Sequence, residues 1–207
     1  LCNSEVYFKC ENFQHTGSFK YRAALNAIKS IPNDFKKRGV ITHSSGNFAH
    51  ALSRASHELN IPCFIIMPSD TPDFKKKSVL KYTNNVIECE SNLKAREETT
   101  KTIMKDKNLF FLHPSNNMDV ILGNSSCAFE FVEDYPNLDF IFSPIGGGGL
   151  IAGTSLAIDY FSKNCEVIGA EPLNVDDAYR SLISGKIETN KSTNTIADGL
   201  RTNLGSI

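Results

Sequence analysis

Short apolar runs alternate with amphipathic stretches along the whole chain, and this pattern most limits the folds open to it. Strand composition is found at residues 6–8, 40–42, 63–67, 86–89, 110–112, 140–142 and 166–170. Helices are predicted over residues 19–30, 48–59, 73–82, 92–107, 119–135, 150–161 and 176–184, and a turn is predicted at residues 36–39. Several apolar runs lack the alternation of a strand with one solvated face, which indicates a sheet covered on both faces. The sequence therefore predicts an α/β protein with parallel sheets and flanking helices.

Composition argues against several classes of partner. The formal net charge is -1 over 207 residues, so nothing favours nucleic acid or an anionic membrane. No apolar run approaches the ~18 residues needed to cross a bilayer. The start, from Leu1 to Glu5, lacks the basic and apolar parts of a signal peptide, and the six cysteines show neither C-x-x-C nor zinc-binding spacing. We expect a cytoplasmic protein without nucleic-acid or membrane partners.

Four consecutive glycines form the most distinctive motif. Gly146, Gly147, Gly148 and Gly149 stand between a predicted strand and a helix predicted from Leu150. Each glycine costs backbone entropy, and a tight turn needs only one or two of them. What the run provides is exposed N–H groups and a close approach at a helix N-terminus, which is typical of a phosphate site. We predict that this loop binds phosphate.

The glycine run leaves the identity of that phosphate open. Gly147-x-Gly149-x-x-Ala152 fits the dinucleotide fingerprint, and Glu171 ends the next predicted strand about twenty residues further on. A NAD-binding oxidoreductase is therefore an alternative. Against it, the fingerprint normally lies at the first strand of its domain, whereas this one comes late in the chain. It also leaves two polar motifs near the N-terminus unexplained.

The first of these motifs contains Lys20. It follows Gly17 and Ser18, a possible N-cap, and stands in the first turn of a helix predicted over residues 19–30. The N-terminal end of a helix carries partial positive charge, so a cation is poorly placed there. This lowers the cost of a neutral amine, which a Schiff-base nucleophile must be. The simpler alternative is an exposed surface lysine.

Ser44-Ser45-Gly46-Asn47 forms a second junction between a predicted strand and a predicted helix. Its N–H groups and hydroxyls suit a carboxylate, and Asn47 suits a phenolate oxygen. The alternative is an ordinary N-cap with a glycine in the turn.

An acidic loop follows the last predicted strand. Glu171 and Asp177 are six residues apart with carbonyl groups between them, a set of oxygen ligands that suits Mg²⁺ or Ca²⁺. The alternative is that Asp176 or Asp177 caps the next helix. The residues by themselves favour the cap.

Together these motifs resemble one family, the fold-type II pyridoxal-phosphate enzymes, and within it the serine racemase/threonine dehydratase group. The matching stretches occur in family order along the whole chain. They are residues 9–14, 16–22, 44–47, 61–68, 113–114, 146–149, 169–172 and 196–199. The resemblance implies a tryptophan-synthase-β-like fold with two parallel-sheet domains, in a chain truncated at both ends. It divides the chain into a large cofactor-binding domain, 1–37 with 119–207, and a small inserted domain, 38–118. It also implies a homodimer.

The resemblance implies a role for each site residue. Lys20 would bind pyridoxal 5'-phosphate covalently and take the Cα proton of the substrate from one face, and Ser45 would return a proton on the other face. The remaining cofactor contacts would be Phe19 and Gly199 on the two faces of the ring, Asn47 at the phenolate oxygen, and Gly146, Gly147, Gly148 and Gly149 with Leu150 around the phosphate. The substrate carboxylate would be held by Ser44, Ser45, Gly46 and Asn47, with Arg96 near the entrance. Glu171, the Val175 carbonyl and Asp177 would bind Mg²⁺ or Ca²⁺, in preference to the cap.

The expected activity is racemisation of serine, with elimination of water from L-serine to give pyruvate and ammonia. Ser45 is the racemase-like feature, because many dehydratases of the group have alanine there. The alternative is a threonine or serine dehydratase without racemase activity. Phe48 departs from the family's usual histidine, and Leu150 stands where methionine is common among racemases. A degenerate relative that only binds a partner is a further alternative, against which Lys20 argues.

Overall fold

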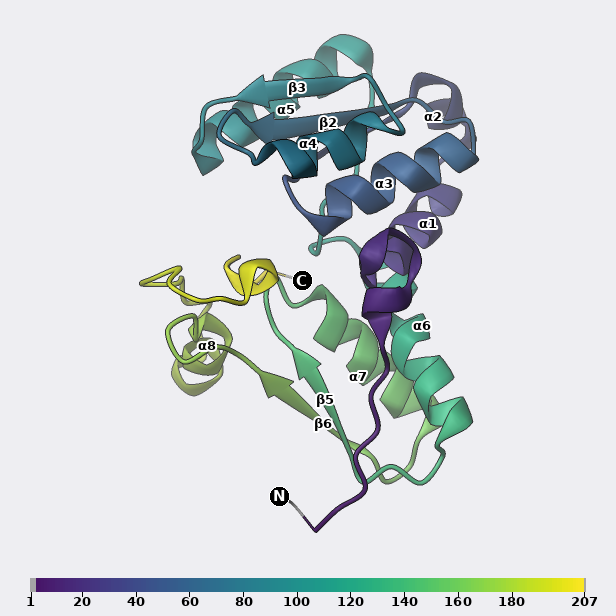
Figure 1. Cartoon of the computed structure of the whole chain (residues 1–207), viewed down its shortest axis with the longest axis vertical. Coiled ribbons are helices and arrows are strands. Elements are labelled where there is room, and N and C mark those ends of the chain that lie inside the picture. The colour runs from purple at the N-terminus through teal and green to yellow at the C-terminus, as the bar shows by residue number, and fades with distance from the viewer. Residues whose placement is uncertain (1–2, 207) are drawn as a thin grey trace.

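The computed structural model describes residues 3–206, so the expectations that rest on Leu1 and Cys2 lie outside the described residues. The described chain forms two parallel sheets, one of four strands in the order β3-β2-β1-β4 and one of the two strands β5 and β6 (Figure 1). The strands are β1 (Val40–His43), β2 (Cys63–Pro68), β3 (Val86–Cys89), β4 (Phe110–Phe111), β5 (Phe140–Pro144) and β6 (Glu166–Ala170). The predicted α/β class with parallel sheets is confirmed.

A helix lies between every two consecutive strands of the described chain. They are α1 (Lys20–Ser30), α2 (Asn33–Arg38), α3 (Asn47–Glu58), α4 (Asp73–Leu80), α5 (Leu93–Lys107), α6 (Met118–Asp134), α7 (Gly149–Phe161) and α8 (Asp177–Ser184), with short 3-10 helices η1 (Glu11–Phe13), η2 (His15–Gly17) and η3 (Asp198–Leu200). In Figure 1 the four-stranded sheet with α3 and α4 lies at the top and β5 with β6 at the bottom. Helices α1 and α6 pack together and join these two parts at one side.

Both faces of the four-stranded sheet are covered, which explains its continuous apolar strands. Val40 and Ile65 belong to a cluster shared with α1 and α3. Ile41 and Ile66 belong to a second cluster, packed against side chains of α5 such as Met104. All four strand residues are fully buried. Neighbouring residues in one strand therefore face two different layers of helices.

Helix α6 continues through a glycine because α1 lies against it at that point. A Cβ added to Gly123 would stand 2.7 Å from the Cα of Ala23 in α1, and one added to Gly153 of α7 would stand 2.6 Å from the Ile121 carbonyl of α6. Glycine in a helix interior costs about 1 kcal/mol relative to alanine. Here the absence of a side chain at Gly123 and Gly153 allows α6 to pack closely against both α1 and α7.

Three local predictions were wrong. Val6, Tyr7 and Phe8, predicted as strand-like, have no ladder pairing in the described chain. Residues 36–39, predicted as a turn, belong to α2 and its C-cap; its signals were a proline before the first residue and Gly39 at φ 112 after the last. Ser18 is not the N-cap of α1: the cap is Phe19, which makes no side-chain cap bond in the described structure.

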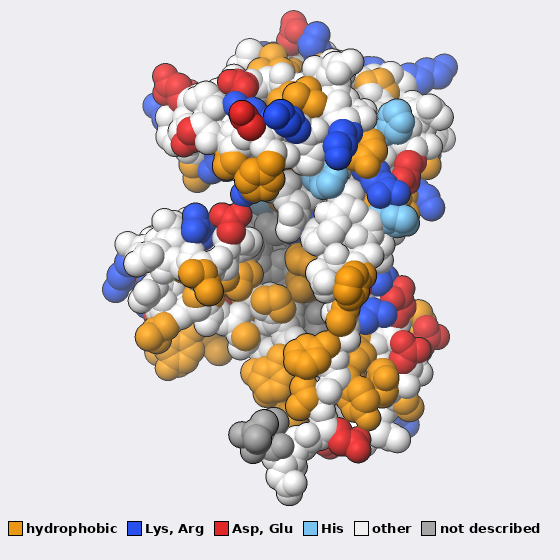
Figure 2. Space-filling model, in the orientation of Figure 1, with side chains coloured by type: hydrophobic (Ala, Val, Ile, Leu, Met, Phe, Trp, Pro, Cys, Tyr) orange, Lys and Arg blue, Asp and Glu red, His pale blue; other side chains and the backbone are white. Residues whose placement is uncertain are grey.

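Within residues 3–206, the β5–β6 sheet is covered by helices on one face and not on the other. Ile141 is 7% exposed and packs against the side of α6 and α7, whereas Phe142, the next residue, is 68% exposed. Figure 2 shows hydrophobic side chains gathered over this lower half, while charged side chains are more frequent on the upper half. This sheet therefore leaves an apolar face open to solvent.

None of the helices in residues 3–206 is long and apolar enough to cross a bilayer. The five cysteines in that range carry free thiols, and Cys2 lies outside it.

Candidate active site

Lys20 and the four-glycine run both contact the loop that follows β4. The Lys20 Nζ, at the start of α1, donates a hydrogen bond of 2.8 Å to the carbonyl of Pro114, in the loop that follows β4. Ser115 of the same loop packs against Gly146 to Gly149, the glycine loop, because a Cβ on Gly147 would stand 2.9 Å from the Ser115 Cβ. The fold thus brings Lys20 and the glycine loop into contact with two adjacent residues of one loop, Pro114 and Ser115, although they are far apart in sequence.

Lys20 is half-buried, and its amine is not that of an ordinary surface lysine. Burial lowers the pKa of Lys20 from 10.5 to about 8. The Nζ lies 5.1 Å from the ring centroid of Phe19 and 5.8 Å from that of Phe48. The helix-end argument predicted the direction of this shift, but its principal cause is the loss of water around the amine. A neutral amine is therefore well populated just above pH 8.

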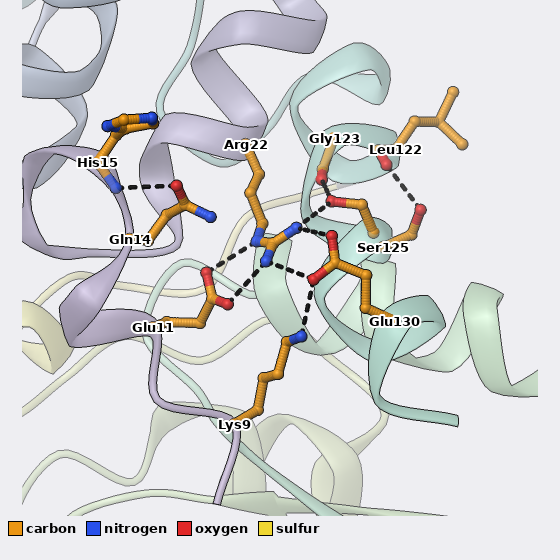
Figure 3. Close-up of polar contacts among 10 residues, drawn as sticks. Lys9, Glu11, Gln14, His15, Arg22, Leu122, Gly123, Ser125 and Glu130 are labelled. Atoms are coloured by element: carbon orange, nitrogen blue, oxygen red, sulfur yellow. Dashed lines mark hydrogen bonds and ion pairs between the residues drawn. The ribbon is translucent and has the colours of Figure 1, made fainter. Parts of the chain in front are cut away.

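Ion pairs fix the first turn of α1 (Figure 3). The Arg22 guanidinium donates to Glu11, with Nε 2.8 Å from Oε2, and to Glu130 of α6, with Nη1 2.7 Å from Oε1. Lys9 Nζ lies 2.7 Å from Glu130 Oε2. Hydrogen bonds from Arg22, and then from Lys9, lower the pKa of Glu130 to about 2. The N-terminal segment and α6 are thereby tied together two residues from Lys20.

The glycine loop opens onto a cavity. Gly148 has φ 84, a conformation that favours glycine, and α7 begins at Gly149. The cavity has a volume of about 230 Å³ and is lined by Gly147, Gly148 and Gly149 with Ser115 and Leu204, among others. The first N–H groups of a helix have no intrahelical acceptor, so the cavity suits a phosphate group. Leu150 is half-buried in the first turn of α7.

The motif Ser44-Ser45-Gly46-Asn47 spans the end of β1 and the start of α3. Ser44 Oγ accepts a hydrogen bond of 3.3 Å from the Gly46 N–H. Gly46 is the N-cap of α3 and makes no side-chain cap bond in the described structure, a geometry that fits the alternative of an ordinary N-cap with a glycine in the turn as well as a carboxylate site. Ser45 is half-buried and Asn47 is exposed. The adjacent Phe48 is buried and brings this turn close to Lys20.

Arg96 and Gly199 reach the same region from other elements. Arg96, in α5, is close enough to His43 at the end of β1 for its charge to lower the pKa of that imidazole, after burial. Its Nε is buried and has no hydrogen-bond partner among residues 3–206. The Gly199 carbonyl would stand 3.1 Å from a Cβ on Gly146. An ion pair of 2.8 Å between Lys75 and Asp198 joins η3 to helix α4.

The residues predicted to bind a metal lie together at the start of α8. Glu171 accepts hydrogen bonds from the N–H groups of Ala178, at 3.1 Å, and Tyr179, at 2.8 Å. Glu171 thus caps the helix, and Asp176, the N-cap by position, makes no side-chain cap bond in the part described. Asp177 is buried; its Oδ2 accepts from Leu204 N–H, and its Oδ1 has no partner within the described chain. Within residues 3–206 there is no cluster of three His, Cys, Asp or Glu side chains that could hold a metal ion.

Comparison with known proteins decides the family. The sequence pattern of the family described as "Pyridoxal-phosphate dependent enzyme" matches residues 1–206. The chain belongs to this family. Within it, the chain falls in the fold-type II group of serine racemases and threonine deaminases, as the resemblance predicted.

Individual relatives are similar over almost the whole chain. The serine racemase of Dictyostelium discoideum is 44% identical over 209 residues, which cover 100% of this chain and 64% of that protein. The beta-hydroxyaspartate dehydratase of Paracoccus denitrificans is 43% identical, covering 97% of this chain and 64% of that protein. The structure of maize serine racemase has a TM-score of 0.92 at 39% identity, covering 95% of this chain and 60% of that chain. The chain thus spans less than two thirds of the length of these relatives.

The alternative of a NAD-binding oxidoreductase is wrong, because the chain belongs to a pyridoxal-phosphate dependent family. The fingerprint Gly147-x-Gly149-x-x-Ala152 describes a strand, a loop and a helix that approach a phosphate. That geometry is shared by several phosphate cofactors, so spacing alone did not separate them.

Sequence reasoning missed two members of the site. The Pro114 carbonyl accepts the hydrogen bond from Lys20, and a backbone carbonyl has no signature in a sequence. His113 and Pro114 belong to the stretches that match the family, but the resemblance assigns them no role. The signal available was their place directly after a strand of a parallel sheet, at the carboxyl edge where sites form.

Proposed function

We propose that this protein is a pyridoxal-phosphate dependent serine racemase that also eliminates water from L-serine to give pyruvate and ammonia. The observation that carries the proposal is the half-buried Lys20, whose pKa is lowered to about 8 and whose Nζ bonds to Pro114 in the loop that also walls the glycine-loop cavity. Relatives named as serine racemases, 44% identical or less, support the substrate.

The residues present fit pyridoxal phosphate. The glycine loop would hold the phosphate, because a side chain on Gly147 would collide with Ser115 and fill the cradle. Lys20 would bind the cofactor's aldehyde carbon, Asn47 the phenolate oxygen, and Phe19 and Gly199 the two ring faces. Bound pyridoxal phosphate supplies an electron sink that makes the Cα–H of an amino acid acidic.

The side chains of this chain then bind the substrate and move protons. Lys20 Nζ, when neutral, accepts the Cα proton on one face, and Ser45 Oγ delivers a proton on the other face to invert the configuration. The backbone N–H groups of Ser45 and Gly46, before α3, orient the substrate carboxylate, and Arg96 adds a positive charge at the entrance. The rings of Phe19 and Phe48 keep water from the amine. When the β-hydroxyl instead takes up a proton and leaves as water after the same proton transfer, elimination gives 2-aminoacrylate, and hydrolysis of 2-aminoacrylate takes up one water to give pyruvate and ammonia.

The test of this proposal is whether Lys20 carries the cofactor. The purified chain, mixed with pyridoxal phosphate, should absorb near ~410–420 nm, where the lysine-bound cofactor absorbs, and borohydride followed by peptide mass spectrometry should place the label on Lys20. Lys20→Ala should lose the band, the label and any turnover, while the exposed Lys29→Ala should keep all three. Turnover that survives in Lys20→Ala would contradict the proposal.

A threonine or serine dehydratase without racemase activity is the second candidate, and the dehydratase relative at 43% identity favours it. Ser45 separates the two. If it returns the proton, Ser45→Ala should reduce D-serine formation by about 10²-fold or more, as for loss of a general acid, and should leave pyruvate formation measurable. Equal D-serine formation by Ser45→Ala and native protein would remove the racemase role of Ser45.

We also infer a divalent cation, a homodimer and a cytoplasmic location, as the resemblance and the sequence predict. The buried Asp177 Oδ1 without a partner in the described chain supports a cation held with Glu171 and the Val175 carbonyl. A rise in melting temperature with Mg²⁺ or Ca²⁺ that Asp177→Asn abolishes would test it. The two separate sheets support the division into 38–118 and the flanking segments.

A further inference from the structure

His113 closes the loop between β4 and α6 through one ring nitrogen. Its Nδ1 accepts hydrogen bonds from the backbone N–H groups of Ser115, at 3.2 Å, and Asn116, at 2.8 Å. A neutral imidazole that accepts at Nδ1 carries its proton on Nε2. The ring therefore caps its own loop, as the side chain of asparagine or aspartate does in an Asx turn.

The loop that His113 caps touches both parts of the candidate active site. The Pro114 carbonyl accepts from the Lys20 amine at 2.8 Å. The Ser115 carbonyl would stand 3.1 Å from a Cβ on Gly149, so it lies directly against the glycine loop. A change in the conformation of residues 113–116 would therefore move the acceptor of the lysine and the wall of the phosphate cavity together.

We propose that His113 is a positioning residue whose Nδ1 holds the Pro114 carbonyl against the Lys20 amine and Ser115 against the glycine loop. It acts through the loop, whose Pro114 carbonyl accepts the hydrogen bond of the Lys20 amine and so occupies a place that water would otherwise take. The proposal rests on the role that the proposed function gives to Lys20, and it adds the residue that fixes the surroundings of that amine.

The surroundings of the ring keep Nδ1 available as an acceptor. His113 is half-buried, with its ring edge-on to His43 at 5.7 Å and to Phe111 at 6.1 Å between centroids. Burial, and then the charges of His43 and Lys20, lower the pKa of His113 to about 4, against a smaller opposing effect of Glu97. The imidazole is therefore neutral at physiological pH.

The test measures the Lys20 amine in the protein without cofactor. Reaction with acetic anhydride, followed by peptide mass spectrometry over a range of pH, should give a midpoint near 8 for native Lys20. In His113→Leu the loop loses its cap and water reaches the amine, so the midpoint should rise toward 10.5, the ordinary value. His113→Asn should keep the native midpoint, because its Oδ1 accepts the same two hydrogen bonds.

The control is a variant of the neighbouring histidine. His43→Leu removes the neighbouring imidazole but leaves the Nδ1 acceptor, so its midpoint should stay near that of the native protein. An unchanged midpoint in folded His113→Leu, or equal shifts in His113→Asn and His113→Leu, would overturn the proposal.

If His113→Leu fails to fold, the ¹⁵N spectrum of the native protein decides: an Nε2–H tautomer supports the proposal and an Nδ1–H tautomer overturns it. Neither measurement uses pyridoxal phosphate, so its result is independent of cofactor binding.

Discussion

At the scale of single residues, Lys20 places a charge where the fold disfavours it. The pKa of Lys20 falls from 10.5 to about 8 on folding, so between those values the unfolded chain holds a proton that the folded chain has released. Stability therefore rises with pH across this window, and below pH 8 the folded protein carries a buried ammonium. At 1.36 kcal/mol per pKa unit this costs about 3 kcal/mol.

We expect Lys20→Met to stabilise the protein at neutral pH. The neutral side chain avoids the buried charge, and losing the hydrogen bond to Pro114 offsets about 1 kcal/mol of the gain. The free energy of unfolding at pH 7 should rise by about 2 kcal/mol, and the gain should vanish as the pH approaches 10.5, the ordinary lysine pKa. Urea unfolding followed by circular dichroism at both pH values measures it. The exposed Lys29→Met should change stability by less than about 0.5 kcal/mol, and a less stable Lys20→Met at pH 7 would contradict the argument.

The residues that sequence reasoning identified share a property that the missed ones lack. Lys20 and the glycine loop each place an unusual residue type at the start of a helix. The residue type and the position in the helix both predict a functional site. The contact of Lys20 with Pro114 joins residues 94 positions apart, and nothing in the local pattern predicts which carbonyl receives the amine. The helix-end argument likewise predicts the direction of the Lys20 pKa shift but not its principal cause, burial. Burial depends on the packing of distant segments.

At the scale of elements, periodicity predicted most helices and strands within one or two residues. The exceptions are segments whose structure depends on distant contacts and is not indicated by a local sequence pattern. Helix α2 is six residues long, too short to show a helical period. Val6 to Phe8 have strand composition, but the described chain places no strand beside them to complete a ladder. Composition therefore identifies a strand only where a neighbour exists to pair with it.

Gly123 provides a test of how closely α6 and α1 pack. A Cβ at Gly123 would lie 2.7 Å from the Ala23 Cα and from the Arg22 carbonyl, so Gly123→Ala should force the helices apart. Overpacking of this kind costs up to about 3 kcal/mol, and the better helix propensity of alanine returns about 1 kcal/mol. A net loss of about 2 kcal/mol is expected in urea unfolding.

Gly46→Ala is the matched control for that prediction. No atom lies within 4 Å of a Cβ at Gly46, and its φ of -122 suits any residue. Because alanine is a poorer N-cap than glycine, the stability of Gly46→Ala should fall by at most about 1 kcal/mol, well below the loss expected for Gly123→Ala. Should Gly123→Ala prove as stable as native protein, the close contact between α1 and α6 would be wrong.

At the scale of the whole molecule, the two sheets differ in how completely they are covered. The four-stranded sheet has helices on both faces, whereas β5 and β6 have helices on one face and solvent on the other. Phe140 and Phe142 on the open face are 52% and 68% exposed. Exposed apolar surface of this kind drives association, so we expect the purified chain to self-associate as its concentration rises.

Replacing Phe142 should weaken that association without weakening the fold. Phe142→Thr removes an exposed aromatic ring and keeps a residue with good strand propensity, so the monomer fraction in light scattering after size exclusion should rise several-fold at equal concentration. Its melting temperature should stay within a few degrees of the native value. The adjacent Ile141→Thr changes a side chain that is 7% exposed and packed in the core, so it should lower stability by about 2 kcal/mol or more. A Phe142→Thr protein that associates as strongly as the native one would show that another surface, and not the open face of β5, drives the contact.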